Sequence, residues 1–72
     1  PGSLSKAVAR LENELGVTVD QVTVILYAGA ALPVLSLTIA GPIPTGSAQY
    51  VDHLLSGSVS KLGPTLKIHP GV

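Results

Sequence analysis

Few side chains in this 72-residue chain are of the types that bind metal ions. Asp52 and His53 are adjacent in the second half of the chain, and His69 lies near its end. Two imidazoles and a carboxylate are ligands that Zn²⁺ accepts. His53 and His69 are therefore the candidate metal ligands if the elements that carry them pack closely, although their spacing alone supports nothing stronger.

The residue types of a serine hydrolase are also present. Three serines, at positions 56, 58 and 60, follow Asp52 and His53 within eight residues. Nucleophilic catalysis needs a hydroxyl, a base and an orienting acid in one place, and no nucleophile-elbow motif surrounds these serines. We therefore predict that the chain is not an enzyme, has no catalytic residues and needs no cofactor.

Composition excludes several further classes. Four Lys and Arg balance four Asp and Glu, and only two Tyr and no Cys are present. A chain without net positive charge or many aromatic residues is a poor nucleic-acid binder, and one without Cys has no disulfides. Because a domain of this size buries only about 60% of its unfolded surface, we predict one domain with a small core.

Apolar residues at helical spacing predict two helices. The first covers residues 4–15 and ends at Gly16, and the second runs from Thr45 or Ser47 to Leu62, where Gly63 and Pro64 stop it.

Two β-branched runs, 22–27 and 34–39, predict a hairpin with Gly29 at a positive φ angle, and residues 65–69 predict a last strand. The run 22–27 is apolar on both faces, which is typical of a central strand or of one whose second face is covered. The order helix, strand, strand, helix, strand predicts an α+β fold, a two-layer sandwich with both helices on one face of the sheet.

The opposite face of that sheet is the predicted interaction surface. No charged residue occurs between Asp20 and Asp52. Uncharged sheets in small domains often form oligomer interfaces, and Ile25, Tyr27 and Val34 would make an apolar patch away from the helices.

A membrane-spanning helix is the alternative for residues 22–43, because this stretch is long and apolar enough to cross a bilayer. Pro33, the alternating pattern of residues 34–39, and flanks without Lys, Arg or an aromatic belt favour strands instead.

Residues 1–3 are typical of the remnant of a cloning linker, and residues 4–72 are expected to form a single small module excised from a larger protein.

Over residues 4–40 the chain resembles SEA-like and related ferredoxin-like modules. The resemblance rests on Leu15-Gly16-Val17, on Val22-Thr23-Val24, and on Gly29 to Leu32 followed by Val34. Ala30 follows Gly29 where self-cleaving members carry a hydroxyl residue, so self-cleavage is not implied. The usual first strand is missing, which would leave one sheet edge open to a partner.

Two other families with this order of elements are also similar. The C-terminal domain of cation diffusion facilitator transporters resembles the chain in Ile68-His69-Pro70 and in His53, positions that in that family help bind metal at a dimer interface. Ring-building modules of secretion and sporulation machines share the order of elements alone.

All three resemblances imply association. We therefore expect a non-catalytic module for self-association or protein–protein interaction within a larger structural or membrane-associated protein. Its partner would be a second copy or another segment of the parent protein. A metal-sensing regulatory domain and the spanning segment at residues 22–43 are the alternatives.

Overall fold

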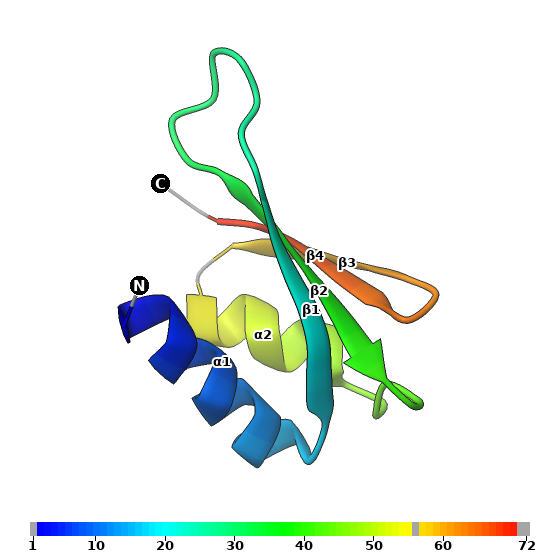
Figure 1. The fold of residues 1–72 in the computed structure, drawn as a ribbon. Coiled ribbons are helices and arrows are strands. Elements are labelled where there is room, and N and C mark those ends of the chain that lie inside the picture. Colours follow the sequence, from blue (N-terminus) through cyan, green and yellow to red (C-terminus); the bar gives the residue numbers. More distant parts are fainter. Residues whose placement is uncertain (1, 56, 71–72) are drawn as a thin grey trace.

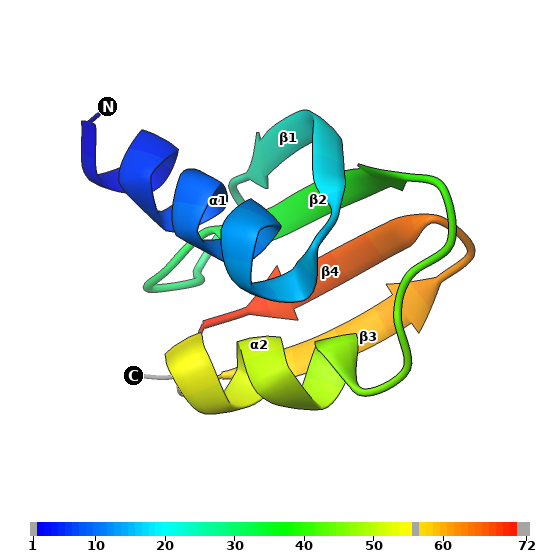
Figure 2. The same ribbon diagram turned by 90° about the horizontal axis from the view of Figure 1, so that it is seen from below.

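A computed structural model of the chain describes residues 2–55 and 57–70, and it places two helices on one face of a four-stranded antiparallel sheet (Figures 1 and 2). The elements are α1 (Gly2–Leu15), β1 (Thr18–Ile25), β2 (Val34–Ala40), α2 (Ser47–Leu55), β3 (Ser58–Leu62) and β4 (Thr65–His69). The predicted two-layer α+β architecture is confirmed, and the predicted order of elements is present with one further strand, β3.

Helix α1 ends where the sequence predicts. Gly16 has a φ angle of 67°, and the amide of Val17 donates a hydrogen bond of 3.1 Å to the carbonyl of Glu12. This is the Schellman arrangement, in which a glycine in the left-handed region closes a helix. It turns the chain directly into β1, which begins at Thr18, four residues before the predicted strand.

The predicted hairpin of β1 and β2 is also confirmed, with Gly29 at a φ angle of 81° in the connecting loop. Its register shifts by one residue between Val19 and Gln21, so that Asp20 has no partner on β2. Such a bulge bends the strand locally. From Gln21 to Ile25 the pairing with β2 is regular.

The second predicted helix is wrong beyond residue 55. Helix α2 ends at Leu55, and residues 58–62 form β3, which pairs with β4. Gly63 and Pro64 are therefore the two central residues of a hairpin turn and not a helix stop. Gly63 has a φ angle of 58°, and because proline fixes its own φ near −65°, the turn is of type II′, which suits a two-residue hairpin.

The order of the strands places β1 and β3 at the two edges of the sheet. The order is β1-β2-β4-β3, so the C-terminal strand β4 lies inside the sheet between β2 and β3. The resemblance implied a missing strand and an open edge, whereas the structure has a fourth strand, β3, at the edge beside β4. Strand β1, predicted to be central or covered, is instead an edge strand.

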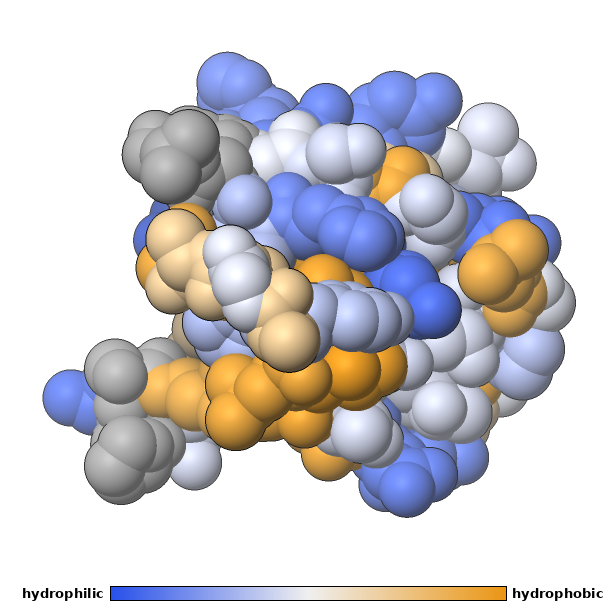
Figure 3. Space-filling model, turned by 90° about the horizontal axis from the view of Figure 1, so that it is seen from above, coloured by the Kyte–Doolittle hydropathy of each residue, from blue (hydrophilic) through white to orange (hydrophobic). Residues whose placement is uncertain are grey.

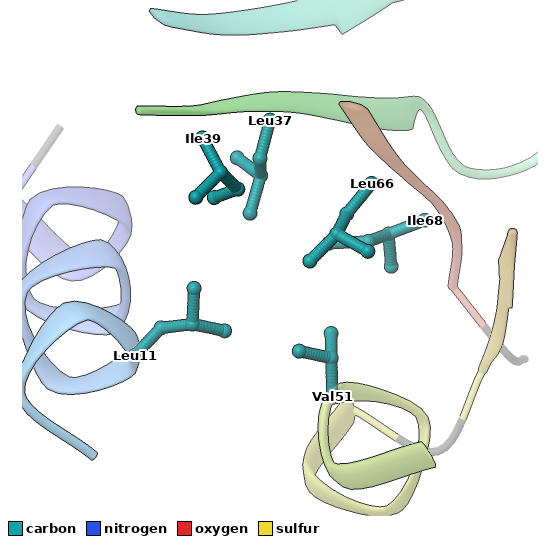
Figure 4. Close-up of a cluster of buried hydrophobic side chains, with 6 residues drawn as sticks. All are labelled: Leu11, Leu37, Ile39, Val51, Leu66 and Ile68. Atoms are coloured by element: carbon teal, nitrogen blue, oxygen red, sulfur yellow. The ribbon is translucent and has the colours of Figure 1, made fainter. Parts of the chain in front are cut away.

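The core lies between the sheet and the two helices. Leu11 of α1 and Val51 of α2 point toward the sheet, where alternate residues of β2 and β4 point back at them (Figure 4). Each of these side chains is at most 3% exposed. The buried cluster consists of Leu11, Leu37, Ile39, Val51, Leu66 and Ile68.

Candidate functional site

The sheet face turned away from the helices, here called the outer face, is mostly polar. Its residues alternate along each strand with the core residues, and the register aligns Thr23 with Ser36 and Ser36 with Lys67. Other polar members of the outer face are Gln21, Thr38, Ser60 and Thr65. The centre of this face is therefore polar, and Ile25 and Val34 lie at one end of it.

The three predicted interface residues have different environments. Ile25 and Val34 are paired across β1 and β2 at one end of the outer face, where Ile25 is half-buried and Val34 is only 5% exposed. Tyr27, in the loop that follows β1, is 50% exposed. Of the three, Tyr27 is therefore the most accessible to a partner, and Val34 is already covered within the chain.

Tyr27 and Val34 share an open pocket of about 390 Å³ between the β1–β2 loop and the end of β4. Its walls are small or apolar except for the imidazole of His69 and the phenol of Tyr27. The lining residues are Tyr27, Ala30, Ala31, Leu32, Val34, His69 and Pro70.

Exposed hydrophobic side chains gather at the same end of the molecule. Val24 is 48% exposed, Leu26 81%, Tyr27 50% and Leu32 43%. We call these four residues the apolar loop surface. In Figure 3, which views the molecule from the side toward which this loop projects in Figure 1, hydrophobic atoms gather in the lower left part of the face.

The apolar loop surface has no charged residue of its own, since residues 21–51 contain no Asp, Glu, Lys or Arg. The sequence prediction included Tyr27 but missed Val24, Leu26 and Leu32. The signal that could have found them is the pair of leucines in an uncharged loop of eight residues, because a small domain leaves a larger fraction of its surface exposed.

The two candidate metal ligands are not brought to one place by the sheet. His53 is exposed on α2, in the helical layer, whereas His69 is exposed at the end of β4 and alternates with the core residue Ile68. His69 therefore faces outward, on the other side of the sheet from the helices. Within residues 2–55 and 57–70, no three His, Cys, Asp or Glu side chains group closely enough to hold a metal ion.

The serines of the hydrolase hypothesis also separate from its other members. Ser58 and Ser60 are exposed on the edge strand β3, while Asp52 and His53 belong to α2. Ser56 lies outside the described residues.

The structure also contains a contact between α1 and the start of β1 that the sequence does not predict. The carboxylate of Glu12 accepts a hydrogen bond of 2.8 Å from the amide of Val19. Val19 is the residue at which the register of β1 shifts. The end of α1 is thus fixed to the irregular part of the edge strand.

The stretch 22–43, considered above as a spanning helix, contains the second half of β1, the connecting loop and all of β2. In the part of the chain that the structure describes, neither helix is long and apolar enough to cross a membrane.

No protein-family model matches the sequence, and neither curated proteins nor solved structures show a significant match to the chain. Its function is therefore argued from its own residues.

Proposed function

We propose that this chain is a non-catalytic module for self-association and that copies meet through the apolar loop surface. The observation that carries this proposal is the clustering of exposed apolar residues. Among the described residues, the exposed large hydrophobic side chains are Val24, Leu26, Tyr27, Leu32 and Leu62, and only Leu62 lies away from the loop.

A cluster of exposed apolar residues indicates a binding surface more strongly than scattered ones do. Single exposed leucines are common on monomeric proteins, whereas a contiguous apolar patch usually marks a binding surface. Burying such side chains stabilises a complex by about 25 cal/mol per Å² of apolar surface before the cost of association. The absence of charge over residues 21–51 removes the repulsion and desolvation that would oppose contact between two such surfaces.

The order of elements supports the same proposal. A ferredoxin-like module runs β-α-β-β-α-β, and this chain runs α-β-β-α-β-β, the same succession with its first strand moved to the end. We propose that the fold is a permuted relative of that class. The SEA-like, transporter and ring-building families that the sequence resembles use such modules to associate.

Mass measured by light scattering after gel filtration tests this function. Over chain concentrations from about 10 µM to about 1 mM, a range that covers weak and moderate affinities, we expect the mass to rise above the 7.3 kDa of one chain. A variant carrying Leu26→Ser and Leu32→Ser should stay at 7.3 kDa, because it removes two of the four hydrophobic side chains.

Leu62→Ser is the matched control. It replaces a leucine that is 61% exposed on β3, away from the loop, and it should associate as the unchanged chain does. A chain that keeps the mass of a monomer at every concentration would rule out self-association as the function.

A further inference from the structure

The two edges of the sheet differ in how they are protected. Strand β3 has five residues, includes Lys61 and has α2 packed against it. Strand β1 has eight residues, contains neither Lys nor Pro, and carries Asp20 as its one charge. Natural proteins usually blunt edge strands with lysine, proline or a covering element, because the unpaired backbone groups of an edge can pair with another chain.

Strand β1 also has the composition of a strand inside a sheet. Val22 and Val24 alternate toward the helical layer, and Thr23 and Ile25 toward the outer face, so both faces carry β-branched residues. Val24 is nevertheless 48% exposed. A second strand beside β1 would supply the neighbours that a central strand has.

Only part of this edge is free. The first half of β1 contains the register shift at Asp20, and the amide of Val19 already donates to the carboxylate of Glu12. The regular segment is Gln21–Ile25. A partner strand would therefore form its backbone hydrogen bonds with these five residues.

We propose that the partner strand is β1 of a second copy, which pairs antiparallel with β1 across a twofold axis beside Thr23. This inference rests on the proposed self-association. Antiparallel pairing of Gln21–Ile25 with itself places Thr23 opposite Thr23 of the partner subunit and Val22 opposite Val24 of the partner subunit. Thr–Thr pairs and pairs of β-branched residues are favourable across strands. The same pairing covers the exposed Val24 in both copies.

Neighbouring registers fit less well. A twofold axis beside Val22 would bring Asp20 and the register shift of β1 into the paired segment. An axis beside Val24 would require the loop residue Leu26 to pair as a strand residue. The register centred on Thr23 uses the regular segment and leaves Asp20 outside it.

This arrangement also joins the edge to the apolar loop surface. Beyond Ile25 the chain continues into Leu26 and Tyr27, which would pass along the partner subunit's β1 toward its bulge. Both features then belong to one symmetric interface, with one strand added to each sheet.

Two matched pairs of variants test the pairing. Val24→Lys and Leu62→Lys each replace an exposed apolar residue on an edge strand by lysine, on β1 and β3 respectively. In light scattering we expect Val24→Lys to reduce the mass from twice 7.3 kDa to 7.3 kDa, and Leu62→Lys to leave the dimer intact.

Cross-linking tests the register independently of stability. Since the chain has no cysteine, Thr23→Cys introduces a single thiol at the proposed axis, and Ser60→Cys introduces one at another exposed hydroxyl position, on β3. Residues directly opposite across antiparallel strands are close enough for a disulfide. On mild oxidation, Thr23→Cys should form covalent dimers and Ser60→Cys should remain monomeric on a non-reducing gel.

The outcomes separate this inference from the proposed function. If the unchanged chain associates while Thr23→Cys cross-links no faster than Ser60→Cys, pairing through β1 is wrong and association through the loop stands. Because Val24 belongs both to β1 and to the apolar loop surface, a Val24→Lys variant that keeps the dimer's mass would contradict pairing through β1 and would also remove Val24 from the loop contact. A chain that is monomeric throughout overturns both. A folded Val24→Lys monomer together with rapid cross-linking of Thr23→Cys supports the inference.

Discussion

The side chain of Glu12 satisfies a backbone amide at the edge of the sheet. Its carboxylate lies near the end of α1, where the helix dipole disfavours a negative charge by a few tenths of a kcal/mol. In exchange it accepts the amide of Val19 at 2.8 Å, at the bulge of an edge strand. A hydrogen bond to a charged group contributes more than one between neutral groups, so the contact stabilises the fold.

We predict that Glu12→Ala lowers the free energy of unfolding by about 1–2 kcal/mol, because the partly buried amide of Val19 loses its acceptor. Urea unfolding followed by circular dichroism measures the change. Glu12→Gln keeps an acceptor oxygen and should lose less than half as much.

Glu14→Ala is the control for this prediction. Glu14 forms an exposed pair with Arg10 at 3.4 Å, and such pairs contribute about 0–0.5 kcal/mol. Equal losses for Glu12→Ala and Glu14→Ala would show that the hydrogen bond to Val19 does not stabilise the fold.

At the same scale, the sequence predicts part of the candidate site. Tyr27 and Val34 are recognisable because they are apolar residues in an uncharged stretch. The burial of Val34 depends on how the β1–β2 loop folds back beside β4, which brings together residues more than thirty positions apart. No local pattern encodes that contact, and none encodes the hydrogen bond between Glu12 and Val19.

Among the elements, the β3–β4 hairpin depends on its turn. Gly63 has a φ angle of 58°, and a Cβ built on it would meet no other atom within 4 Å. Substitution there is therefore opposed by backbone conformation and not by a clash.

We predict that Gly63→Ala lowers the free energy of unfolding by about 1–2 kcal/mol, while Gly63→Asn costs less because asparagine is tolerated better than alanine at the positive φ of a type II′ turn. Chemical denaturation of both variants provides the measurement. An alanine variant as stable as the unchanged chain would contradict the type II′ turn.

This hairpin is also the element that the sequence does not predict. Val51, Leu55, Val59 and Leu62 recur at helical spacing, so periodicity alone extends α2 through residues that form β3. In the structure Leu62 is 61% exposed, whereas Leu66 is fully buried. Gly57 and the pair Gly63-Pro64 carried the opposite signal, since a glycine before a proline suits the centre of a type II′ turn. The pairing of β3 with β4 across this turn decides between the two patterns.

For the molecule as a whole, small size means that the proposed self-association would also change stability. A chain of 72 residues buries only about 60% of its unfolded surface. Its buried cluster comprises six side chains beneath the sheet, while apolar side chains at the loop remain exposed. A second copy that covers this surface binds the folded chain and not the unfolded one, so it must raise the apparent stability by mass action.

Thermal unfolding should therefore depend on concentration. In the range where the chain is dimeric, each tenfold increase in chain concentration shifts the equilibrium by about 0.7 kcal/mol per chain, which for a domain of this size raises Tm by about 4 °C. Because Val24→Lys is expected to be monomeric, its Tm should not change with concentration. Circular dichroism melts of both chains at three concentrations check this. A concentration-independent Tm for the unchanged chain, together with a monomer's mass, would contradict self-association. The core of six side chains and the two hairpins would then hold the fold without a partner.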